Sequence, residues 1–144
     1  MATIPKTHRR VVLVRRPPGE PVESDFRVEE APVPEPRHGE VLVRVIYLSL
    51  DPYQRGRMRD AASYAAAVGL NEVMTGGTVG EVVASHNASF KVGDIVEDRL
   101  GWQEYAIGGV TALYCEIEPH SATRPKVLML RSTASEISPP TLSK

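Results

Sequence analysis

The chain has 144 residues, 42% of them hydrophobic and 24% charged, which suits one soluble domain. Its 17 basic and 18 acidic side chains leave a net charge of −1, so no strongly basic footprint for a nucleic-acid partner is expected. No apolar run approaches the roughly 20 residues that span a bilayer, and the charged N-terminus lacks a signal-peptide core, so no membrane partner is expected and the cytoplasm is the default compartment.

The first part of the chain is predicted to form three strands. Residues 10–14 are a β-branched run, and residues 26–30 alternate apolar and charged side chains as a half-buried strand does. Residues 40–50 are the strongest strand prediction, because the alternation there is longest. The prolines of residues 17–21 predict a turn between the first two strands, since proline fixes φ and cannot donate to a strand ladder.

The third predicted strand ends in a rigid corner. Asp51 suits the N-cap of a helix and Pro52 its first position, which predicts one short helical turn from Pro52 to about Met58. The alanine-rich residues 60–70 that follow lack an apolar stripe. We therefore expect a loop with a weak helix there, rather than a core helix.

The rest of the chain is predicted to be rich in strands separated by glycine turns. Strands are expected at residues 75–85, 95–96, 101–107 and 112–117. In the third of these, Trp102, Glu104 and Ala106 are expected to share one face. Short strands at this spacing are typical of a small, mainly β domain.

The composition changes near residue 120. Residues 121–144 are rich in serine, threonine and proline and carry four basic residues against one acid, Glu136. We therefore divide the chain into a domain over residues 1–119 and a tail over residues 120–144. The tail is expected to be flexible, because it has too little apolar surface to offset the entropy lost on ordering.

Metal and nucleophile chemistry have little local support. The single cysteine, Cys115, has an acidic neighbour, which favours an inert thiol. No two of the four histidines have the spacing that places both on one helix face, so no metal site is expected. The glycines of residues 76–80 precede a strand instead of opening a helix, so they are interpreted as a turn and not as a phosphate-binding loop.

The corner at residues 51–58 carries the most distinctive side chains. Tyr53 offers a phenol that can stack or donate a hydrogen bond, and Arg55 and Arg57 suit a phosphate or a carboxylate. A structural interpretation stands beside the functional one. In it, Tyr53 packs under the turn, and the arginines are solvated or paired with nearby aspartates.

Four stretches carry a family pattern in order and spacing. They are residues 36–43, residues 45–58, residues 76–83 with 90–96, and residues 101–106. The second, VIYLSLDPYQRGRM, is the most distinctive. Together they resemble the zinc-independent medium-chain dehydrogenases/reductases, the group of the leukotriene B4 dehydrogenase/prostaglandin reductases, plant 2-alkenal reductases and bacterial curcumin reductases.

This resemblance implies a mainly β fold, namely a GroES-like, partly open β-barrel with short helical turns and without the Rossmann domain. It also implies NADPH as the cofactor, and small-molecule enones or alkenals as substrates. In the family, hydride adds at the β-carbon and the C=C bond is reduced. A homodimer is compatible with the resemblance.

The resemblance also assigns site residues by position. Pro52 and Tyr53 inherit contact with the cofactor, and Tyr53 also inherits contact with the substrate. Tyr64, in a variable loop, is expected to line the substrate pocket. Gln54, at the pocket edge, stands where the family usually has methionine. No catalytic residue is assigned, because the family's principal catalytic tyrosine lies beyond the end of this chain.

The chain departs from the family after about Ile107, and no strand, glycine turn and helix of a nucleotide-binding domain follow. A truncated gene product, a frame shift and an excised domain all fit this departure. We expect the isolated chain to be inactive and to expose part of a barrel face. The rival interpretation is a stand-alone β-barrel interaction module whose basic tail binds a partner.

Overall fold

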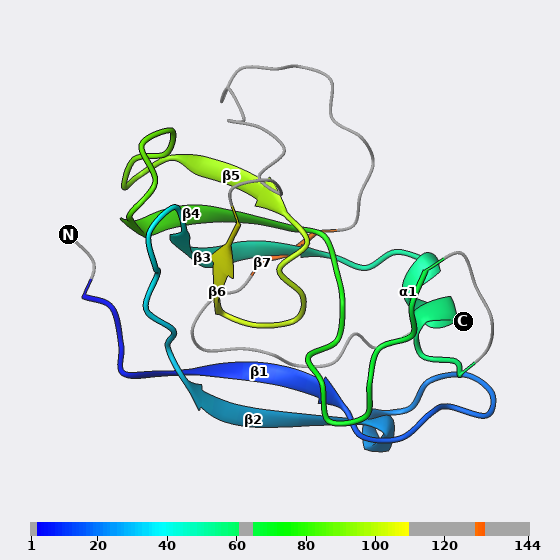
Figure 1. Cartoon of the computed structure of the whole chain (residues 1–144). Coiled ribbons are helices and arrows are strands. Elements are labelled where there is room, and N and C mark those ends of the chain that lie inside the picture. The colour runs from blue at the N-terminus through cyan, green and yellow to red at the C-terminus, as the bar shows by residue number, and fades with distance from the viewer. Residues whose placement is uncertain (1–2, 61–64, 110–128, 132–144) are drawn as a thin grey trace.

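The computed structural model of the chain describes residues 3–60, 65–109 and 129–131. Its strands form two sheets, one of two strands and one of five, and neither closes on itself (Figure 1). The described part is therefore the mainly β, partly open GroES-like domain that the sequence predicts. None of its helices is long or apolar enough to cross a membrane.

The two-stranded sheet pairs β1 (Thr7–Leu13) with β2 (Phe26–Pro32) in antiparallel register. The short 3-10 helix η1 (Glu23–Asp25) precedes β2. Its last residue, Asp25, is 0% exposed, and its carboxylate accepts hydrogen bonds from the Val22 N–H (2.9 Å) and from the Arg15 guanidinium (2.6 Å). A buried aspartate thus fixes the connection between the two strands.

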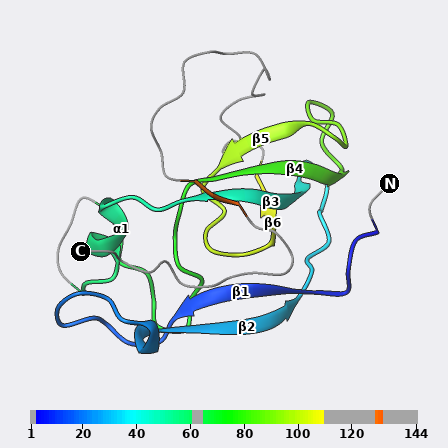
Figure 2. The ribbon, with the colours of Figure 1, turned by 180° about the vertical axis from the view of Figure 1, so that it is seen from behind.

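The five-stranded sheet is built around β3 (Val41–Ser49). On one side β3 pairs with β4 (Thr78–Ser85), which pairs in turn with β5 (Ile95–Asp98). On the other side its first half pairs with β6 (Tyr105–Gly108) and its end with β7 (Met129–Arg131). Figure 2 shows β7 beside β3 from behind.

The buried apolar residues form two clusters. One lies on the five-stranded sheet and consists of Val41, Val43, Val45, Val82, Val96, Leu100 and Ala106. The other consists of Leu13, Met58, Val68 and Met74, with Phe26 and Trp102 packed against it. The second cluster includes residues of β1 and of the segment after α1 (Tyr53–Arg57), so it joins the two-stranded sheet to the α1 end of the molecule.

Strand β1 connects the two sheets through the edge that does not pair with β2. The Val11 N–H donates to the Trp102 carbonyl (2.8 Å), and the Glu104 N–H donates to the Arg9 carbonyl (3.1 Å). The Arg9 guanidinium also forms an ion pair with the Glu104 carboxylate, with 2.6 Å between nitrogen and oxygen. Both views show β1 and β2 as a separate layer below the larger sheet (Figures 1 and 2).

The prediction that Trp102, Glu104 and Ala106 share one face is wrong. Trp102 and Ala106 belong to different clusters and Glu104 pairs with Arg9, so these side chains do not share one face. The reason is that β6 begins only at Tyr105, after a turn in which Gly101 has a φ of +79°. A side chain at Gly101 would also meet the Met74 carbonyl oxygen at 2.7 Å, so this turn requires glycine.

The helix cap also differs from the prediction. Pro52 occupies the N-cap of α1, and the side chain of Asp51 makes no cap hydrogen bond. Asp51 instead accepts a hydrogen bond from the Ser49 hydroxyl (2.7 Å). The Asp-Pro sequence therefore ties the corner back to the end of β3. The predicted strand at residues 112–117 and most of the tail lie outside the described residues, apart from β7.

Candidate functional site

The corner between β3 and α1 is held by local hydrogen bonds. The Gln54 N–H donates to the Asp51 carbonyl (3.1 Å), and the Arg55 N–H donates to the Pro52 carbonyl (3.1 Å). With the Ser49 bond to the Asp51 carboxylate, they fix the corner from both sides. The backbone that carries Pro52 and Tyr53 is therefore set by local contacts, as a preorganised site requires.

Arg55 locks α1 onto the proline-rich loop after β1. Its Nη2 donates to the Pro17 carbonyl (3.1 Å) and to the Gly19 carbonyl (2.7 Å). The Arg16 guanidinium reaches across in the opposite direction and donates to the Met58 carbonyl (3.0 Å). Arg55 thus bonds to backbone carbonyls instead of to an aspartate, and it serves to attach two segments distant in sequence.

Gln54 points inward and is only 4% exposed. Its Nε2 donates to the Ser49 carbonyl (2.8 Å). A side chain on Gly76 would lie 2.9 Å from this nitrogen and 2.8 Å from Leu48 Cδ1, so a larger residue there would require Gln54 or Leu48 to shift. Gly76, one of the glycines predicted as a turn, therefore leaves space for the Gln54 side chain.

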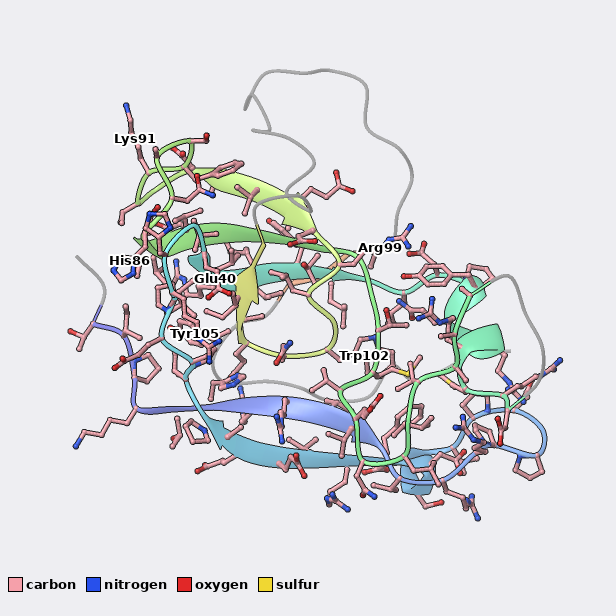
Figure 3. The ribbon with its side chains drawn as sticks, in the orientation of Figure 1. Glu40, His86, Lys91, Arg99, Trp102 and Tyr105 are labelled. Carbon is pink, nitrogen blue, oxygen red and sulfur yellow. The ribbon has the colours of Figure 1, made fainter. Side chains whose placement is uncertain are left out.

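Pro52 is exposed and Tyr53 is half-buried, so the phenol is not sealed in the interior. The guanidinium carbon of Arg99 lies 6.0 Å from the centroid of the Tyr53 ring. Figure 3 shows Arg99 on the α1 side of the large sheet, whereas His86 and Lys91 lie towards its other end. Tyr53 and Arg99, which are 46 positions apart in the sequence, thus lie close together at the corner. No pattern in the sequence indicates this role for Arg99.

The structure brings together the corner residues but leaves some candidates aside. Tyr64 and Cys115 lie outside the described residues. Within the described ranges, no three histidine, cysteine, aspartate or glutamate side chains gather as metal ligands do. A groove of about 570 Å³ lies at the other end of β3, beside Ile4, Pro34, Leu42 and His86.

Two buried acids show opposite electrostatic behaviour. Burial raises the pKa of Asp98, whose carboxylate accepts a hydrogen bond from the Arg99 N–H (2.6 Å). Asp25 has a lowered pKa, first because its carboxylate accepts the Val22 N–H and then because Arg15 lies beside it. The Asp25 carboxylate therefore stabilises the loop to which Arg55 is hydrogen-bonded, and the Asp98 carboxylate stabilises the backbone at Arg99.

Comparison with known proteins identifies the domain. Residues 9–114, which include the corner and both sheets except β7 and the start of β1, match the N-terminal domain of oxidoreductases. The chain belongs to this family. Its relatives in the family include the NADPH-dependent curcumin reductase of Escherichia coli, which is 51% identical over 100 residues, or 69% of this chain and 29% of that protein.

Two further relatives match a similar share of the chain. The NADP(+)-dependent 2-alkenal reductase of Nicotiana tabacum is 36% identical over 106 residues, which cover 70% of this chain and 31% of that protein. The crystal structure of CurA in complex with NADPH from Vibrio vulnificus has a TM-score of 0.72 and 48% identity, over 78% of this chain and 34% of that chain. The chain thus spans about a third of the length of the relatives it matches.

Proposed function

We propose that this chain is the substrate domain of an NADP-dependent reductase that acts on the C=C bond of α,β-unsaturated ketones and aldehydes. The observation that carries the proposal is the half-exposed Tyr53 on a corner fixed by hydrogen bonds on both sides. The similarity to an NADPH-dependent curcumin reductase and to a 2-alkenal reductase supports the choice of cofactor and of substrate class.

The corner suits a nicotinamide ring. Pro52 is exposed and Tyr53 is half-buried, so the corner offers a proline ring and a phenol ring, the kind of groups on which a flat heterocycle packs. When bound, NADPH supplies the hydride that adds to the β-carbon of the substrate. Pro52 and Tyr53 orient the ring, and the Tyr53 hydroxyl donates a hydrogen bond to the substrate carbonyl.

The proposal includes the remaining expectations from the sequence. Tyr64 lines the substrate pocket, and the reaction needs no zinc. The enzyme acts in the cytoplasm on a small molecule and not on nucleic acid, and a homodimer is compatible with it. Because the chain spans about a third of its relatives, we expect it to need a dinucleotide-binding domain for turnover.

A fusion tests the proposal directly. Residues 1–107 of this chain would replace the matching segment of the Escherichia coli curcumin reductase, and oxidation of NADPH would be followed with 3-nonen-2-one. We expect turnover by the fusion and none by the 144-residue chain. A folded fusion that leaves NADPH unoxidised would contradict the reductase proposal, and turnover by the 144-residue chain would contradict its need for a second domain.

A further inference from the structure

Hydrogen bonds of Asp98 and Leu100, the two neighbours of Arg99, fix the position of the Arg99 backbone. Its own N–H donates to the Asp98 carboxylate (2.6 Å), and Asp98 is 6% exposed. The Thr78 hydroxyl donates to the Asp98 carbonyl (2.8 Å) and accepts a hydrogen bond from the Leu100 N–H (3.4 Å). The loop after β5 is therefore anchored to β4, and the exposed side chain of Arg99 extends from a fixed point.

The Arg99 guanidinium is not neutralised by a carboxylate within the described residues. The five ion pairs found there use other arginines, namely Arg9, Arg10, Arg15, Arg27 and Arg44. Two nearby acids in sequence accept other donors, because Asp98 accepts the Arg99 backbone N–H and Asp51 accepts the Ser49 hydroxyl. Within the described residues, Arg99 thus brings a positive charge to the Tyr53 ring without an ion-pair partner.

We propose that Arg99 is a specificity-determining residue that selects enones carrying a carboxylate. This inference rests on the proposed function, because it places the enone at Tyr53. The guanidinium lies within reach of a cation–π contact with the ring, and its planar fork of N–H groups matches a carboxylate with two parallel hydrogen bonds. Because the guanidinium carbon lies 6.0 Å from the centroid of the Tyr53 ring, the substrate that suits this site has a short aliphatic spacer between enone and carboxylate.

The test uses two probes with the same enone. Sodium 7-oxo-oct-5-enoate carries a carboxylate beyond three methylene groups, and its methyl ester lacks the charge. Each would be titrated into the isotope-labelled 144-residue chain, and the NMR signals of the Arg99 Nε–H and the Tyr53 ring would be followed. We expect the acid to bind about tenfold more tightly than the ester, as one charge-assisted contact allows.

Two variants separate a specific contact from general attraction. Arg99→Gln is expected to remove the preference for the acid, so that acid and ester bind with similar affinity. Arg37→Gln changes another exposed arginine, which precedes β3 at the far end of the sheet, and is expected to keep the preference. Equal binding of acid and ester by the unaltered chain, no binding of either, or an unchanged preference in Arg99→Gln would each overturn the proposal.

The same experiment keeps the two proposals apart. If the fusion with the curcumin reductase reduces 3-nonen-2-one while the acid shows no preference for Arg99, only the selectivity inference fails. If the fusion does not reduce the neutral enone but Arg99 still discriminates between acid and ester, the site binds carboxylates and the reductase proposal fails.

Discussion

The two ends of β3 are built from different interactions. At its beginning, Val41 and Val43 are fully buried between β4 and β6. At its end, residues 47–49 are half-buried beside a register shift, and the chain is held by polar contacts of Ser49, Gln54 and Arg55. Apolar burial therefore secures the scaffold, whereas directed hydrogen bonds shape the corner where the ligand is proposed to bind.

The largest effect is expected at the buried end. Val43→Ala should lower the free energy of unfolding by about 2–3 kcal/mol, because it removes buried carbon atoms and leaves a cavity in the cluster on the large sheet. Leu48→Ala at the half-buried end removes more atoms but should cost less, about 1 kcal/mol. Urea unfolding of both variants measures the difference, and an equal or reversed order would contradict the contrast between the two ends.

The second prediction concerns the grip of α1 on the proline-rich loop. Arg55→Ala should lower the free energy of unfolding by about 1–2 kcal/mol, because two carbonyls lose a charged donor. It should also speed proteolysis within residues 17–21. Arg59→Ala, at an exposed position just after α1, serves as the control and should change stability by less than about 0.5 kcal/mol. Similar effects of the two variants would show that the grip is unimportant.

The third prediction is a pH dependence that arises far from the corner. Burial lowers the pKa of His8 below 6.5, despite the nearby Glu104 carboxylate. The unfolded chain therefore binds a proton at His8 more readily than the folded chain, and stability should fall as the pH drops below about 6.5. His8→Gln should reduce the change in urea midpoint between pH 7.5 and 5.5, whereas substitution of the exposed His38 by Gln should not. A profile unaffected by His8→Gln would contradict the assignment.

The smallest effect is expected from the residue that departs from the family pattern. Gln54→Met would remove the hydrogen bond to the Ser49 carbonyl but keep a side chain of similar volume in a buried position. We expect a loss of stability of about 1 kcal/mol or less, as for one hydrogen bond. Circular dichroism during thermal unfolding measures it, with Gln103→Met, whose amide donates to the Leu100 carbonyl, as the comparison.

The sequence predicts the scaffold well because local patterns determine it. The strand predicted at residues 40–50 is observed as Val41–Ser49, and the helical turn predicted from Pro52 is observed as Tyr53–Arg57. Alternating burial and the Asp-Pro sequence are local signals, so neither required knowledge of the fold. The family resemblance likewise rests on contiguous stretches, and it is confirmed over residues 9–114.

The corner's partners were not predictable in the same way. Arg99 meets Tyr53 only because β5 lies beside β4 and its loop is anchored there, and Arg55 reaches Pro17 across a long separation in sequence. Such contacts depend on how strands pair, which residue patterns alone leave open. Asp51 was assigned to the wrong partner for a related reason, since a nearby serine hydroxyl competed with the helix end.

The most direct test of the account is the role of Tyr53 in a complete enzyme. In the fusion with the curcumin reductase, Tyr53→Phe should lower kcat/KM for 3-nonen-2-one about tenfold, because one hydrogen bond to the reacting carbonyl is lost while the ring remains. Circular dichroism should show an unchanged fold. Unchanged kinetics in Tyr53→Phe would contradict the claim that this corner presents its phenol to the substrate.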